Sequence, residues 1–237
     1  MGYIDVHSHV LPGLDDGSRS MEQSLEMLRI AHSEGIEIII ATPHNMPGKG
    51  QPSREKVLER IENLQKEAHR AGISVKILMG TEYFYREEVP ELLEDGKGIG
   101  MNGSEYVLVE FDPMVESRYF CNALQNIMGA GYRPIVAHVE RYAKVMDNPA
   151  VLKDLKRMGV LLQVNAASVI GDNGRGVKKD VKKLLKEHLV DFVGTDAHSD
   201  GRGAPRMEKC ATYLAKKYGG DYAWQLLCSN AGEYFGI

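Results

Sequence analysis

The sequence predicts an α/β fold in which parallel strands alternate with helices and close into a barrel. Two observations support this prediction. Short β-branched apolar runs alternate with longer stretches at helical spacing from one end of the chain to the other. Repeated strand-then-helix units imply parallel strands with right-handed crossovers, and about seven such units favour a closed barrel over an open sheet. Residues 1–237 show no linker and are expected to form one domain.

The expected strands are short and apolar, and polar residues stand at or just beyond their ends. They cover 4–6, 36–41, 75–79, 106–110, 134–137, 161–165 and 192–194. The expected helices are amphipathic and cover 21–34, 53–71, 119–130, 151–158, 177–186 and 206–218. Ser53 is a suitable N-cap for the second helix, and Gly35 and Gly72 follow helix ends. In a barrel of this kind, chemistry is expected where the strands end at their carboxyl side.

Composition and charge argue against several classes of protein. An apolar fraction of 43% with mixed charges is typical of a globular chain. No run approaches the ~20 apolar residues that span a bilayer, so a cytoplasmic protein with no membrane insertion is expected. The net charge of −4 gives no basic field for a nucleic acid. Cys121, Cys210 and Cys228 are too far apart in the sequence for a disulfide framework or a zinc finger.

Imidazoles and carboxylates stand at the ends of six of the seven expected strands. In chain order they are His7 and His9, His44, Glu82, Glu110, His138, and Asp196 with His198. A lone histidine near a strand end is more often a hydrogen-bonded structural residue. So many ionisable groups at one barrel mouth, however, would repel one another or lose their solvation unless cations balanced them. The two imidazoles of the HxH pair share one face, because strand side chains alternate.

This ligand set predicts a site for more than one metal ion. Imidazoles with bridging carboxylates suit manganese, iron or zinc better than magnesium or calcium, which prefer shells made of oxygen alone. The candidates are too many for one ion and would hold two or three. They are His7, His9, Glu82, Glu110, His138, Asp196 and His198, with Asp16 and His44 in reserve. Ions in such a site lower the pKa of a bound water and neutralise an oxyanion, so a hydrolase is expected.

Taken in order, the motifs DVHSH, ATPH, the isolated Glu82, VLVEF, AHVERY and TDAH resemble the polymerase and histidinol phosphatase (PHP) superfamily. Within it, HSHVLPGLDDG, VEF and AHVERY resemble the bacterial manganese-dependent protein tyrosine phosphatases of capsule and exopolysaccharide operons. The resemblance covers essentially the whole chain, including the spacing between the motifs. It implies a distorted TIM-like (β/α)7 barrel of the PHP type with a trinuclear metal site.

The resemblance also implies roles for particular residues. It gives the seven principal candidates as metal ligands, and Asp16 and His44 as residues of the third metal. Manganese is the implied metal, with two or three ions per chain and iron, zinc or magnesium as alternatives. Arg141 and Arg202 match arginines that contact the substrate phosphate, and guanidinium groups bind phosphoryl oxygens in pairs. With His44, a candidate to protonate the leaving phenolate, and Asp16, these arginines form the expected catalytic set.

The expected function is therefore hydrolysis of phosphotyrosine in a protein. By resemblance, the substrate is the tail of a bacterial tyrosine autokinase that controls capsule or exopolysaccharide synthesis. Cysteine-based phosphatase chemistry is excluded, because it needs an arginine six positions after the cysteine and those positions hold Ile127, Lys216 and Tyr234. Five aromatic residues fit either an apolar rim for a peptide or contacts in the core or between subunits of a homo-oligomer: Tyr83, Phe84, Tyr85, Tyr119 and Phe120.

Two other functions fit part of the pattern. A small-molecule phosphomonoesterase of the histidinol-phosphate type shares much of the metal set, although the LPGLDDG and HVERY contexts favour the tyrosine phosphatase branch. A metal-stabilised module that binds phosphorylated tails would need the metals and the arginines but no reactive water. Comparing turnover of a phosphotyrosyl peptide with turnover of histidinol phosphate distinguishes a tyrosine phosphatase from a phosphomonoesterase of the histidinol-phosphate type. Peptide binding without phosphate release would identify the binding module.

Overall fold

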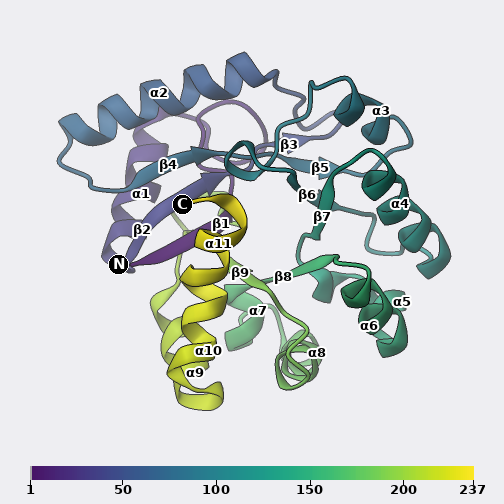
Figure 1. The fold of residues 1–237 in the computed structure, drawn as a ribbon. Coiled ribbons are helices and arrows are strands. Elements are labelled where there is room, and N and C mark those ends of the chain that lie inside the picture. The colour runs from purple at the N-terminus through teal and green to yellow at the C-terminus, as the bar shows by residue number, and fades with distance from the viewer. Residues whose placement is uncertain (1) are drawn as a thin grey trace.

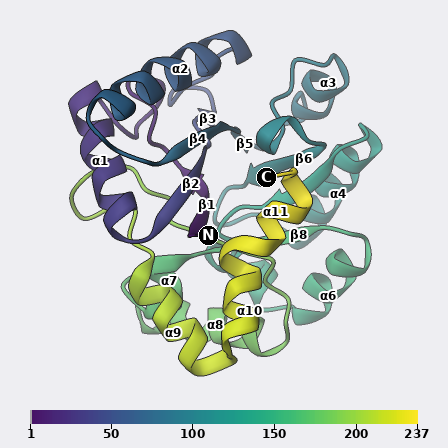
Figure 2. The ribbon, with the colours of Figure 1, turned by 60° about the vertical axis from the view of Figure 1, so that its left-hand side comes forward.

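Helices surround a ring of parallel strands in the computed structural model, which describes residues 2–237 (Figure 1, Figure 2). The strands are β1 (Tyr3–Ser8), β2 (Ile36–Ala41), β3 (His44–Asn45), β4 (Lys76–Met79), β5 (Glu82–Phe84), β6 (Tyr106–Glu110), β7 (Arg133–Val136), β8 (Leu161–Asn165) and β9 (Phe192–Gly194). The helices are α1 (Met21–Ser33), α2 (Arg54–Arg70), α3 (Val89–Glu94), α4 (Ser117–Gly129), α5 (Ala143–Met146), α6 (Pro149–Arg157), α7 (Ala166–Ile170), α8 (Arg175–Lys186), α9 (Glu208–Tyr218), α10 (Gly220–Trp224) and α11 (Asn230–Phe235).

The strands form two parallel sheets that continue into each other. One sheet has the order β1-β2-β4 and the other the order β3-β5-β6-β7-β8-β9. Hydrogen bonds bridge the breaks between β2 and β3 and between β4 and β5, since Gly80 N donates to Ala41 O (2.9 Å) and Glu82 N donates to Pro43 O (3.2 Å). Pro43 has no N–H for the ladder, and a Cβ at Gly80 would lie 2.8 Å from Ile40 Cγ2. These two residues explain why both strands are interrupted at the same level.

The sheet closes where the last strand meets the first. Ser8 and Ala197 form an isolated parallel bridge, and Asp196 N donates to His7 O (2.8 Å). The buried carboxylate of Asp5 reinforces this closure, because it accepts a hydrogen bond from Thr195 N (2.8 Å) just after β9. With β2 and β3 counted as one position and β4 and β5 as another, the described chain has seven strand positions around a distorted barrel. The predicted α/β barrel is confirmed.

The barrel interior is apolar at the end where the strands begin. Leu108, Ile135 and Phe192 belong to one buried cluster there, together with Phe235 of α11. The Phe192 and Phe235 rings stack with centroids 5.2 Å apart, and α11 lies in front of the ring of strands in both views (Figure 1, Figure 2). The C-terminal helix therefore closes the end of the barrel opposite to the one where the strands finish.

The six predicted helices are present as α1, α2, α4, α6, α8 and α9, with ends shifted by at most two residues. The prediction missed the short elements β3, β5, α3, α5 and α7, and the C-terminal helices α10 and α11. The first five have too few residues for a periodic pattern to show. Helices α10 and α11 are joined without a gap by the π-helical turn Gln225–Ser229, which interrupts the 3.6-residue period between them. No helix of residues 2–237 has the length and apolarity that crossing a membrane requires. The three cysteines are unpaired, and Cys210 and Cys228 are buried.

Candidate metal centre

The first strand delivers two imidazoles to the mouth of the barrel, the end where the strands finish. Ile4 and Val6 of β1 lie in the apolar interior. The register of β1 against β2 shifts between Asp5 and Ser8, where this apolar pattern gives way to histidines. His7 Nε2 and His9 Nε2 lie 3.3 Å apart. The predicted shared face of the HxH pair is therefore present in the structure.

Glu82 is the centre of the cluster. This fully buried carboxylate has Oε2 3.2 Å from Nε2 of both His7 and His9. The same oxygen lies 3.1 Å from His44 Nδ1, and Oε1 lies 3.0 Å from His138 Nε2. A carboxylate with imidazoles on both of its oxygens has the arrangement of a ligand that bridges two metal ions.

Three further carboxylates complete the cluster. Glu110 Oε1 lies 3.0 Å from His44 Nδ1. Asp196 Oδ1 lies 3.5 Å from His7 Nε2 and 3.6 Å from His9 Nε2. Asp16 sits at the outer edge, with Oδ1 3.3 Å from His44 Nε2 and 3.7 Å from His198 Nε2. The structure thus brings together all nine side chains that the sequence singled out as ligands.

The potential ligand atoms fall into groups compact enough to hold a cation. In each of three groups these atoms lie within 4.8 Å of one another: His7, His9 and Glu82; His44, Glu82 and Glu110; and His9, His44 and His198. Because neighbouring groups share residues, ions held by them would share ligands.

Two members of the cluster have an unusual backbone conformation. His138, just after β7, has φ of 32°, and Asp196, just after β9, has φ of 55°. Non-glycine residues rarely adopt positive φ, at a cost of order 1–3 kcal/mol each, and such residues gather at functional sites. Hydrogen bonds hold both in place, because His138 N donates to Gln163 Oε1 (2.7 Å) and Asp196 N donates to His7 O (2.8 Å).

Side chains around the cluster orient its histidines. His7 Nδ1 faces Gln163 Oε1 at 3.1 Å, and His9 Nδ1 faces Asp15 Oδ2 at 2.8 Å. An acceptor at Nδ1 keeps the ring proton there and directs the lone pair of Nε2 toward the cluster. His198 follows the same rule, with Nδ1 2.9 Å from the backbone oxygen of Asp196.

Sequence reasoning missed both Asp15 and Gln163. Asp15 lies next to the predicted Asp16, but its carboxylate is almost fully buried and also accepts from His44 N (2.9 Å). Gln163 lies in β8, the strand that carries no predicted ligand, and is fully buried. Its Nε2 donates to Asn165 Oδ1, and Asn165 Nδ2 donates to Asp196 Oδ2 (2.8 Å). The available signal was a pair of amides in an otherwise apolar strand.

The electrostatics of the cluster favour positive charge. Burial favours the neutral form of Glu82, but the charge of His7 and the close imidazoles of His138 and His44 outweigh it and hold the pKa of Glu82 well below its usual range. Burial disfavours the charged form of His44, yet the close carboxylates of Glu110 and Glu82 raise its pKa to about 9. Without a metal, the carboxylates therefore draw protons onto neighbouring imidazoles.

Several buried atoms of the cluster lack a hydrogen-bond partner within residues 2–237. They are Nδ1 and Nε2 of His44, Oε2 of Glu82 and Oε1 of Glu110. These atoms approach one another at angles that make no hydrogen bond, and a buried polar atom left in this way costs about 1–3 kcal/mol. Metal ions would bind one nitrogen of His44 and the two carboxylate oxygens, and the other His44 nitrogen would carry the ring proton, so the residues present fit a multinuclear metal site.

The two predicted phosphate-binding arginines differ in position. Arg141 Nη2 donates to Asp196 Oδ2 (2.6 Å), which fixes it beside the cluster, and its side chain is 44% exposed. Arg202 lies in the loop after β9 and lines a separate pocket with Thr195 and Arg206. A cation that the sequence did not indicate, Lys49 Nζ, lies 2.9 Å from Asp16 Oδ2.

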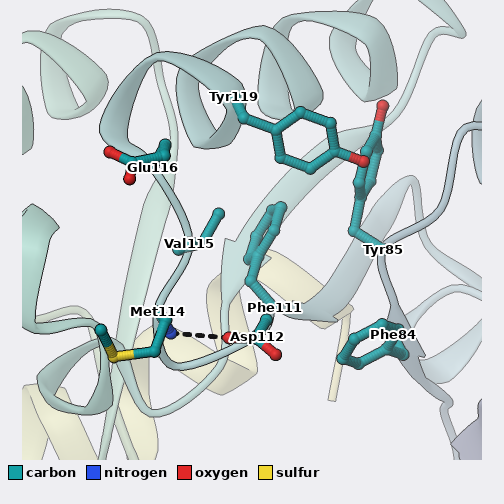
Figure 3. A pocket seen from close by; sticks show the side chains of 8 residues that line it. All are labelled: Phe84, Tyr85, Phe111, Asp112, Met114, Val115, Glu116 and Tyr119. Carbon is teal, nitrogen blue, oxygen red and sulfur yellow. Dashed lines mark hydrogen bonds between the residues drawn. The ribbon is translucent and has the colours of Figure 1, made fainter.

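The five aromatic residues proposed for a rim or a core divide between the two. Tyr83 and Phe120 are buried in the core. Phe84, Tyr85 and Tyr119 line the pocket shown in Figure 3, and Tyr85 is also buried in the core.

Comparisons with known proteins identify the family of this chain. The family model "Capsular polysaccharide synthesis, CpsB/CapC" matches residues 3–235. The chain is 31% identical over 232 residues to tyrosine-protein phosphatase CpsB of Streptococcus pneumoniae, covering 96% of each chain. It is 31% identical over 223 residues to tyrosine-protein phosphatase YwqE of Bacillus subtilis, covering 94% of this chain and 88% of the relative.

Solved structures show the same likeness. A chain from the crystal structures of YwqE from Bacillus subtilis and CpsB from Streptococcus pneumoniae, described as unique metal-dependent tyrosine phosphatases, superposes with a TM-score of 0.91 at 30% identity and covers 98% of this chain and 94% of that one. Histidinol phosphate phosphatase from Lactococcus lactis, at 17% identity and a TM-score of 0.62 over 92% of this chain and 94% of its own, shares the fold. Because the family model spans nearly the whole sequence, the chain belongs to the CpsB/CapC family of capsular polysaccharide synthesis.

Proposed function

We propose that this chain is a metal-dependent protein tyrosine phosphatase. The observation that carries the proposal is the buried cluster around Glu82, in which ligand atoms converge and four of them have no hydrogen-bond partner. The relatives named tyrosine-protein phosphatase, similar over nearly the full length of this chain, support the same activity. The free cysteines support it as well, because none is followed by the arginine that a cysteine-based phosphatase needs.

In this proposal the nine clustered side chains hold two or three manganese ions. His7, His9, Glu82 and Asp196 would hold one ion, Glu82, Glu110 and His138 a second, and Asp16, His44 and His198 a third at the outer edge. Iron, zinc or magnesium could replace manganese, although the imidazole content disfavours magnesium. Bound ions would supply a water of lowered pKa and would neutralise the phosphoryl oxygens.

The protein's own groups bind and orient the phosphate. Arg141 is anchored through one nitrogen on Asp196, so its other donors can pair with phosphoryl oxygens at the mouth. Arg202 would approach from the loop that carries His198. His44 either holds the third ion together with Asp16 or protonates the departing phenolate, whose conjugate acid has a pKa of about 10.

The proposed substrate is a phosphotyrosyl protein, specifically the tail of a bacterial tyrosine kinase in capsule synthesis. The family's description supports the capsule context. A kinase tail of this kind would place the reaction in the cytoplasm.

The test is phosphate release from a phosphotyrosyl peptide by chelator-stripped protein, with and without added manganese, and with a His7→Ala control. We expect activity that metal restores and that the variant lacks, with two to three equivalents of bound metal by mass spectrometry. Histidinol phosphate is assayed alongside. A strong preference for it would reject the proposal, and stoichiometric peptide binding without phosphate release would indicate a binding module instead.

A further inference from the structure

A pocket of about 490 Å³ lies between the end of β5, the segment after β6 and the start of α4 (Figure 3). It is next to the metal cluster along both strands. Phe84 follows Glu82 by two residues on β5 and is the register partner of Glu110 on β6. Phe111, another wall of the pocket, directly follows Glu110. Phe84 shares a face of β5 with Glu82, and same-face neighbours on a strand are about 7 Å apart, so the edge of the pocket formed by Phe84 is within reach of a chain whose phosphate sits in the cluster.

The pocket is apolar and open. Met114 is 64% exposed and Tyr119 is 44% exposed, and they are two of the five large hydrophobic side chains that are exposed in the described part of the chain. Grouped apolar side chains at the surface of a concavity are typical of a binding site.

The inner wall of the pocket is held rigidly. Tyr85 stacks on Phe111 with ring centroids 5.5 Å apart and meets Tyr119 edge-on at 5.8 Å, as Figure 3 shows. Asn126 Nδ2 donates to the Tyr85 hydroxyl (3.2 Å), and Phe111 N donates to the Tyr142 hydroxyl (3.0 Å). A ligand would therefore find a preformed surface and would not need to order it.

The rim of the pocket is acidic. Asp112 and Glu116 line it and are exposed. Burial raises the pKa of Tyr119, and the negative charges of nearby Glu87 and Glu88 add to this shift. Glu116 is paired with Lys144, so Asp112 is the carboxylate of the lining that adds net negative charge, and Glu87 and Glu88 lie near Tyr119 outside the lining. The rim complements a basic side chain and repels an acidic one.

We propose that this pocket binds an apolar or aromatic side chain within about three residues of the phosphotyrosine, and that its rim favours a lysine or arginine beside that side chain. The inference rests on the proposed function and names the sequence that the phosphatase prefers around the phosphotyrosine. The occupant is the substrate chain itself, because the pocket shares β5 and β6 with the cluster that would hold the phosphate.

The test uses the full chain loaded with manganese and a matched set of phosphotyrosyl peptides. Phenylalanine or serine is placed at each of the three positions on either side of the phosphotyrosine, with lysine or glutamate next to it. We expect kcat/KM about tenfold higher for phenylalanine with lysine than for serine with glutamate at one of these positions, mainly through KM. Free phosphotyrosine serves as the reference substrate that cannot reach the pocket.

The double substitution Met114→Ser and Tyr119→Ser removes the exposed wall, and both side chains are exposed enough for the fold to tolerate the change. The preference for phenylalanine should shrink to within about twofold, whereas Met158→Ser, at an exposed methionine elsewhere, should keep it. Equal rates for all peptides in an active wild-type enzyme would overturn the inference and leave the proposed function standing. A preference for phenylalanine that survives the double substitution would also overturn the inference. So would a double variant whose only change, measured by sedimentation of the protein, is its oligomeric state.

Discussion

The two ends of the barrel interior use the same strands for opposite purposes. On β6, inward positions run from Leu108, in the apolar cluster, to Glu110 at the mouth. On β8 they run from Leu161, in the same apolar cluster, to Gln163 and Asn165. One end is closed by Phe235 and excludes polar groups, whereas the other gathers buried carboxylates and imidazoles. The comparison teaches that the apolar end stabilises the fold, whereas the polar end, with its strained backbone and unsatisfied buried atoms, destabilises it. The first contribution offsets the second.

Among changes at the polar end, Glu82→Gln is expected to have the largest effect on activity and metal binding. We expect phosphatase activity to fall by about 10³-fold or more, since losing a bridging carboxylate removes several kcal/mol of charge stabilisation. Metal content, measured on the purified protein, should fall by at least one equivalent. Glu105→Gln, at an exposed carboxylate just before the neighbouring strand β6, is the matched control and should change neither. Full metal content in the Glu82 variant would show that the cluster is not the metal site.

The corresponding change at the apolar end is Phe235→Ala. Deleting a ring that packs on Phe192 and Tyr106 should lower the free energy of unfolding by about 3 kcal/mol. Denaturant titration measures this loss. Metal stoichiometry in native buffer should stay as in the wild type, because the cluster lies at the other end. A variant that kept its stability but lost metal would contradict the division between the ends.

The substitution Gln163→Leu tests the hydrogen bonds that orient His7 and His138. Without the acceptor for His7 Nδ1 and His138 N, metal affinity should weaken by about 10- to 100-fold, as measured by competition with a chelating dye. Gln163→Glu keeps an acceptor oxygen and should recover part of that affinity. If the leucine variant bound metal within twofold of the wild type, the amide would have only a packing role.

The proton balance of the polar end gives the smallest effect. His44 has a pKa of about 9 in the metal-free protein, and a metal ion binds only the deprotonated imidazole. Metal affinity should therefore rise by about fivefold as the pH increases from 8 to 9, as one proton with this pKa requires. His44→Gln should flatten the profile. A wild-type affinity that does not depend on pH would place His44 outside the coordination of the metal.

Much of the fold and of the candidate site could be predicted, because both depend on local patterns. Strand ends in a parallel barrel meet at one mouth, so polar residues such as His138 and Asp196 could be placed together from the sequence alone. The positive φ of these two residues could not be predicted, since neither is glycine. The contact between His7 and Gln163 joins residues 156 positions apart and depends on how the barrel closes. The closing role of α11 was missed for the same reason.

The closure between β1 and β9 has a consequence for how the chain holds itself together. Few backbone hydrogen bonds join these strands, yet the cluster takes His7 and His9 from one side of this seam and Asp196 and His198 from the other. Metal ions bound across the seam would fasten the first strand to the last. A ligand that binds only the native state stabilises that state by mass action. The ions would therefore stabilise the closure between β1 and β9 as well as take part in the chemistry, and their removal would weaken the barrel at this closure.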